Sequence, residues 1–150
     1  MPQPSPPAPS ALALWLGRAG LLPFVLGAVA TAAVSGEWRN LVASALIAYG
    51  ALIVSFLGGL HWGLALRHAD PQASLLAWGM VPSLLAWPAL LMPPAAGPSW
   101  LGVVLIVCYA VDHRVFAQQG VSAWLGLRRQ LTAVASLSCL AAAAVWAFAG

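Results

Sequence analysis

Long apolar runs, separated by short polar segments, dominate this chain of 150 residues. Charged residues make up only 6% of the chain, whereas a soluble domain carries about 25% to cover its surface. Lipid must therefore be the solvent for most of the molecule. Backbone groups in lipid have to form hydrogen bonds within their own segment, so such runs fold as helices. The sequence thus predicts an all-α integral membrane protein rather than a soluble domain.

Five runs are long enough to cross about 30 Å of hydrocarbon, which takes roughly 17 to 25 residues of helix. The predicted spans cover residues 19–35, 41–66, 73–92, 99–118 and 131–149. The fourth span reaches a full crossing only by including Asp112. The Pro-rich opening at residues 1–14 is predicted to be a disordered tail. Residues 15–150 are then a single transmembrane domain.

The arginines predict how this domain is oriented. Only Arg39 lies on the outer side of the predicted spans. The other five lie on the side of the amino terminus: Arg18, Arg67, Arg114, Arg128 and Arg129. Positively charged residues stay inside, so we expect the N-terminus inside and the C-terminus outside. Arginines at helix ends suit lipid phosphates, so the net charge of +3 indicates a membrane rather than nucleic acid.

The stretch SFLGGLHWG, at residues 55–63, combines small residues and a histidine inside the second span. Ser55, Gly59 and Gly63 are four residues apart, which gives a stripe that lets another helix approach closely. Packing within the bundle and homodimerisation are both compatible with this stripe. His61 points about 160° away from the middle of the stripe, so it lies on a different face of the helix.

A histidine within a bilayer needs a partner, a cavity or water. Asp112 lies at a comparable depth, since both residues are roughly 8–10 Å from the inner boundary at 1.5 Å per residue. We therefore predict a His61–Asp112 hydrogen bond, with Arg67 and Arg114 as neighbours. Two interpretations remain open: a polar clamp between helices, or a site that handles protons or binds a hydrophobic ligand.

Few residues suit catalysis or a bound cofactor. The acidic residues are Glu37, Asp70 and Asp112, and no serine lies in a nucleophile motif. No Cys/His spacing predicts a metal site, and no second histidine lies deep enough for haem ligation beside His61. We expect no catalytic centre, metal or cofactor. The expected partners are the lipid bilayer and another membrane protein or a second copy of the chain.

Five elements of the chain carry a resemblance to a known family. They are GLLPF at residues 20–24, YGALIVSFLGGLHWG at 49–63, VPSLLAW at 81–87, Asp112, and LRRQLT at 127–132. Over residues 15–148 the chain resembles a family of small bacterial membrane proteins classed only as a domain of unknown function. That family includes the mitochondrial transmembrane protein 69, and SFLGG followed by HWG is the most specific element. The resemblance implies an inner-membrane protein and brings no known activity or site residues.

Small size, few polar groups and the lack of a soluble domain favour a non-catalytic accessory or assembly role. The alternative is a membrane protein that binds a hydrophobic ligand or handles protons through His61 and Asp112.

Overall fold

Helices make up almost all of the computed structural model, which describes residues 8–148. The elements are α1 (Ala11–Ala19), α2 (Leu22–Ala33), α3 (Gly36–Ala65), α4 (Ala73–Leu91), α5 (Gly97–Gln118), the short 3₁₀ turn η1 (Ser122–Trp124) and α6 (Leu125–Phe148). No strand occurs within the described range. Five segments are long and apolar enough to cross a membrane: Ala11–Ala33, Gly36–Ala65, Ala73–Leu91, Gly97–Gln118 and Ser122–Phe148. The predicted all-α class with five transmembrane helices is confirmed.

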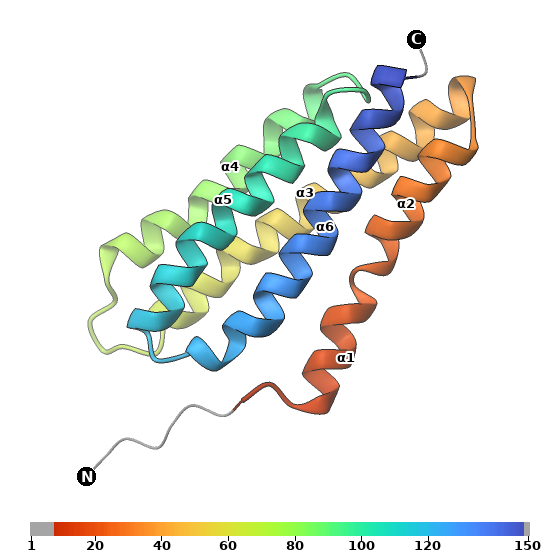
Figure 1. The fold of residues 1–150 in the computed structure, drawn as a ribbon. Coiled ribbons are helices and arrows are strands. Elements are labelled where there is room, and N and C mark those ends of the chain that lie inside the picture. Colours follow the sequence, from red (N-terminus) through yellow and green to blue (C-terminus); the bar gives the residue numbers. More distant parts are fainter. Residues whose placement is uncertain (1–7, 149–150) are drawn as a thin grey trace.

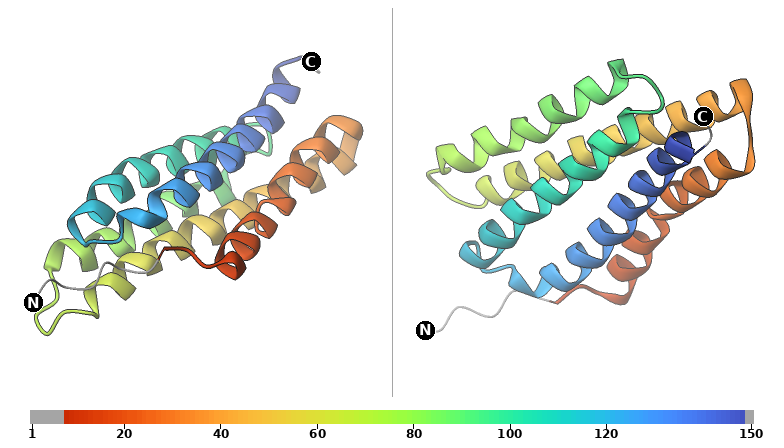
Figure 2. Two further views of the ribbon diagram at one scale, coloured as in Figure 1. Left: turned by 60° about the horizontal axis from the view of Figure 1, so that its bottom comes forward. Right: turned by 45° about the horizontal axis from the view of Figure 1, so that its top comes forward.

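The five spans lie side by side in one bundle (Figures 1 and 2). The longest helix, α3, packs along α4, and α5 packs along α6. The first span joins them through α2, which contacts both α3 and α6. The chain enters α1 at one end of the bundle and leaves α6 at the other (Figure 1), as an odd number of crossings requires.

One apolar core connects the helices. Its most buried members include Phe24 of α2, Val54 of α3, Leu101 and Leu105 of α5, and Cys139 of α6. Lipid tails are as apolar as these side chains, so moving them from lipid into the core gains little. The helices are therefore held together by close van der Waals packing and by polar contacts between spans.

The first span begins earlier than the predicted residues 19–35. Helix α1 starts after Ser10, whose hydroxyl oxygen accepts a hydrogen bond from the Ala13 amide at 3.2 Å. This cap satisfies one of the free amides in the first turn of the helix. Residues 11–14 of the predicted tail are therefore helical, and residues 1–7 lie outside the described part of the chain.

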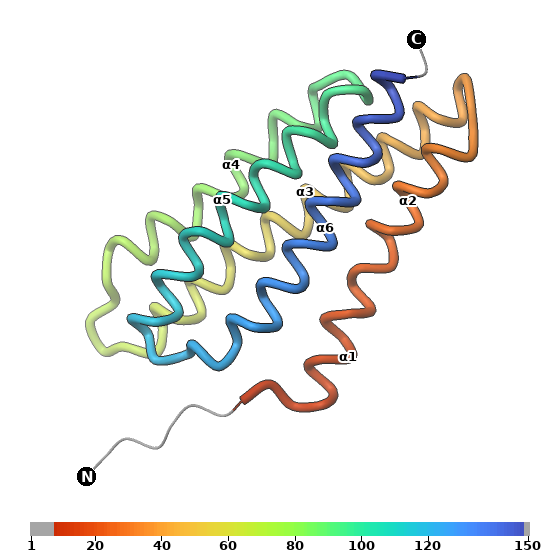
Figure 3. The backbone as a smooth tube through the Cα atoms, viewed as in Figure 1, coloured from red at the N-terminus to blue at the C-terminus, as the bar shows by residue number. Residues whose placement is uncertain are grey.

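A break at Gly20 and Leu21 divides the first span into two helices (Figure 3). Pro23 has no amide hydrogen, so it cannot continue the hydrogen bonds of α1. It lies instead in the first turn of α2, where a missing amide hydrogen costs little. Tyr49 of α3 donates its hydroxyl to the Gly20 carbonyl oxygen at 2.8 Å. A side chain from another span thus satisfies a backbone group at the break.

Replacing Tyr49 with phenylalanine should lower the free energy of unfolding by about 1 kcal/mol. The substitution removes the donor to the Gly20 carbonyl but keeps the edge contact between this ring and Phe24, whose centroids are 5.2 Å apart. Reversible unfolding in mixed detergent micelles measures the change. An unfolding free energy equal to that of the unmodified protein would contradict a stabilising role for the hydroxyl.

The last span begins at Leu125 instead of residue 131. The connection between the last two predicted spans is therefore reduced to a turn at Gly120 and the short η1. Gly120 has a φ of +71°, which glycine adopts without steric strain. Arg128 consequently lies in the first turns of α6, where it is buried inside the bundle.

Candidate functional site

Asp112 lies at the centre of a buried polar cluster to which three helices contribute. The residue is on α5 and is fully buried. Arg128 of α6 donates from Nε to Asp112 Oδ2 at 2.6 Å and from Nη1 to Thr132 Oγ1 at 2.7 Å. Hydrogen bonds between charged groups are strong in a low-dielectric interior. The pair therefore fixes α6 against α5 in one register.

His61 of α3 completes the cluster and is also almost fully buried. Its Nδ1 lies 3.2 Å from the Leu57 carbonyl oxygen, which can only accept a hydrogen bond. Its Nε2 lies 3.3 Å from Asp112 Oδ1, but without hydrogen-bond geometry. The structure therefore brings His61 and Asp112 into contact, and that contact is not the hydrogen bond that was predicted.

Arg67 and Arg114, the predicted neighbours, lie outside this cluster. Both residues are exposed. Arg67 comes after the end of α3, and Arg114 is about 200° around α5 from Asp112. Arg128, which was predicted only to lie on the side of the amino terminus, pairs with Asp112 instead. The feature of the sequence that indicates a buried role for Arg128 is its spacing of four from Thr132, which puts both residues on one helical face.

The closest backbone approach between α3 and α4 involves a glycine outside the predicted stripe. A Cβ atom added to Gly59 or Gly63 would meet no described atom within 4 Å, so no other helix lies close to these two glycines. Gly58 makes the close approach instead, against the backbone of Gly79 on α4. Gly58 lies one turn before His61 on the same buried face. Homodimerisation through Ser55 and the other stripe residues stays a prediction.

The described polar contacts of the cluster link side chains and backbone groups within α6 and between α5 and α6. Ser136, one turn after Thr132, donates its hydroxyl to the Thr132 carbonyl oxygen at 2.6 Å, so it is not paired with a base. Within residues 8–148, no three His, Cys, Asp or Glu side chains are placed to hold a metal ion. Cys108 and Cys139 are free, buried thiols. The polar groups thus join three spans without forming a nucleophile–base pair.

Comparison with known proteins identifies the family. Residues 9–144 match the family model described as "Protein of unknown function (DUF3429)". Transmembrane protein 69 of Xenopus tropicalis is 39% identical over 130 residues, which is 84% of this chain and 51% of that protein. Transmembrane protein 69 of Mus musculus is 29% identical over 130 residues, or 84% of this chain and 53% of that protein.

The chain therefore spans about half the length of these curated relatives. No solved structure matches it. The family match extends over nearly the whole chain, and the protein therefore belongs to this family of membrane proteins of unknown function.

Proposed function

We propose that the protein is a non-catalytic accessory protein of the bacterial inner membrane, which assists the assembly or stability of another membrane protein. The observation that carries this proposal is the Arg128–Asp112 pair, whose buried charges compensate each other between two spans. A catalytic centre would instead need an acid, base or nucleophile that is free to reach a substrate. The relatives named transmembrane protein 69 support a role within the bilayer.

The proposed orientation has the end of α3 and the start of α6 at the cytoplasmic face. Exposed Arg67, Arg114 and Arg129 lie at this end of the bundle, and Arg39 lies at the other end in the first turns of α3. Arg128 is paired inside the bundle, so it contributes less to this asymmetry than the sequence suggested. The remaining bias still favours an N-terminus inside and a C-terminus outside.

Photo-crosslinking in intact cells tests the accessory role. A photoreactive phenylalanine replaces Leu26 of α2 or, in a second variant, Leu84 of α4; both side chains are more than half exposed on the bundle surface. We expect a crosslink to one discrete membrane protein at one of these positions, because a specific partner covers one face. The amount of that membrane protein should fall at least about twofold when the chain is deleted, a modest effect of the kind that lost stabilisation produces.

Purification of the tagged protein in mild detergent provides the second measurement. Recovery of the crosslinked partner together with the chain, at a constant ratio, supports the proposal. A monodisperse protein without any partner, together with crosslinks to lipid alone at both positions, would contradict it.

A further inference from the structure

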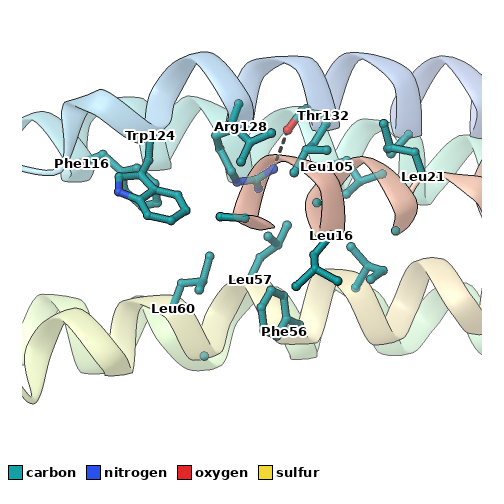
Figure 4. A pocket seen from close by; sticks show the side chains of 18 of the residues that line it. Leu16, Leu21, Phe56, Leu57, Leu60, Leu105, Phe116, Trp124, Arg128 and Thr132 are labelled. Carbon is teal, nitrogen blue, oxygen red and sulfur yellow. Dashed lines mark hydrogen bonds between the residues drawn. The ribbon is translucent and has the colours of Figure 1, made fainter. Parts of the chain in front are cut away.

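A cavity of about 680 Å³ lies between α1, α3 and α6 (Figure 4). Its walls are apolar and include Leu16 of α1, Phe56 and Leu60 of α3, and Phe116 of α5. Binding sites for small molecules typically measure roughly 300–1,000 Å³ and combine an apolar lining with a few polar groups. In size and lining, this cavity resembles such a site.

Arg128 supplies the polar group at this cavity. Figure 4 shows its guanidinium directed into the space between α6 and α3, beside Thr132. Two of its nitrogens are occupied, Nε by Asp112 and Nη1 by Thr132. The third, Nη2, has no hydrogen-bond partner in the described part of the chain, although the residue is only 7% exposed. A buried donor of a charged group is unfavourable without an acceptor.

The mouth of the cavity opens on the side of the bundle. Leu16 and Phe56 line the cavity and are 55% and 64% exposed, so they place its mouth between α1 and α3. Helix α1 packs lightly, mainly against α6. In a membrane this side faces lipid tails, so an apolar molecule can enter from the bilayer without crossing water.

The charges of Arg128 and Asp112 determine which kind of oxygen acceptor can bind at Arg128 Nη2. The formal charges of Arg128 and Asp112 cancel within the bundle. A carboxylate bound at Nη2 would bring a second negative charge close to Asp112, which is costly in a low-dielectric interior. A neutral carbonyl oxygen can accept the hydrogen bond without adding charge.

We propose that this cavity binds an apolar, lipid-like molecule whose neutral carbonyl oxygen accepts a hydrogen bond from Arg128 Nη2. A quinone and an acylglycerol ester both present this group. The inference goes beyond the accessory role and does not depend on it. It also differs from the ligand site predicted around His61 and Asp112, because neither residue lines the cavity.

Native mass spectrometry of the full chain tests the proposal in dodecyl maltoside, a detergent that has no carbonyl group. The probes are a decyl-substituted benzoquinone, monoolein, oleate and hexadecane. We expect saturable one-to-one binding of the quinone or of monoolein, and the probe that binds identifies the source of the carbonyl. Hexadecane should bind at least about tenfold more weakly, which corresponds to the loss of one charge-assisted hydrogen bond. Oleate should also bind at least about tenfold more weakly, because its charge would lie close to Asp112.

Three variants separate recognition from folding. Arg128→Lys keeps a positive charge for Asp112 but removes the Nη2 donor, so quinone or monoolein affinity should fall about tenfold. Gly59→Leu fills the cavity from a position with no described atom within 4 Å and should abolish binding. Gly126→Leu is the matched control, because Gly126 also has open space around it but does not line the cavity. The affinity of the Gly126→Leu variant for the quinone or monoolein should equal that of the unmodified protein.

Any of the following results would overturn the proposal: equal affinity for hexadecane and the carbonyl probes, a preference for oleate, no binding of any probe, or unchanged binding in the Gly59→Leu variant. Loss of binding in Gly126→Leu would have the same consequence. None of these outcomes affects the crosslinking experiment, so failure of one proposal is distinguishable from failure of the other.

Discussion

Replacing Arg128 with methionine is expected to lower the free energy of unfolding by about 3–5 kcal/mol. The substitution leaves the carboxylate of Asp112 buried without its charged partner, and it leaves Thr132 without its donor. Removal of one member of a buried ion pair is among the most damaging changes to a folded protein. Reversible unfolding in mixed detergent micelles, or thermal aggregation in one detergent, measures the loss.

Arg129→Met is the matched control, because Arg129 is the next residue of α6 and is exposed. Its unfolding free energy should change by less than about 0.5 kcal/mol, as surface substitutions usually do. The double variant Arg128→Met with Asp112→Leu should recover most of the lost stability, since neither charge is then buried. Equal losses for Arg128→Met and Arg129→Met would show that the pair does not hold α5 to α6.

Replacing Gly58 with alanine is expected to destabilise the protein by about 1–3 kcal/mol. The added methyl group would overlap the carbonyl oxygen of Gly79, which belongs to the backbone of α4 and cannot rotate away. Helices α3 and α4 would have to separate, and both would lose van der Waals contacts along their shared face. In a bilayer such contacts are a main source of helix association, so the loss is not offset elsewhere.

Gly59→Ala gives the comparison within the same helix. A methyl group at Gly59 meets no described atom within 4 Å, and alanine favours the helix over glycine by up to about 1 kcal/mol. This variant should be as stable as the unmodified protein or slightly more stable. Equal destabilisation by both substitutions would place the close helix contact on the wrong glycine.

The three middle spans could be predicted from the sequence to within a few residues. The predicted residues 41–66, 73–92 and 99–118 correspond to α3, α4 and α5. Their length follows from bilayer thickness, and polar or proline-containing segments interrupt the apolar runs on both sides.

The first and last spans were predicted to begin too late. Both begin next to segments with polar residues. The start of the first span depends on the cap at Ser10, and the start of the last span depends on the buried partner of Arg128.

The glycine prediction shows where helical periodicity alone is insufficient. Spacing of four favoured Gly59 and Gly63, yet His61 lies about 160° around the helix from the middle of that stripe. A histidine in a membrane helix faces the bundle interior, so close helix packing is expected on the face that carries His61 rather than on the stripe away from it. Gly58 lies about 60° from His61 around the helix and therefore shares its buried face. The position of His61 together with the glycine positions therefore indicates Gly58, the glycine that contacts Gly79.

The amino-acid sequence by itself determined that lipid surrounds most of this protein, that its fold is all-helical and that five of its segments are long enough to cross a membrane. Those properties follow from apolar composition and the requirement that backbone groups in lipid pair within their own segment. Only the tertiary structure decided that Arg128 pairs with Asp112, that Gly58 rather than Gly59 contacts α4, and that a cavity forms beside Arg128 Nη2, which has no partner among residues 8–148. The physical reason is that a sequence specifies the faces of each helix, whereas the rotation and neighbours of each helix depend on packing among all five spans.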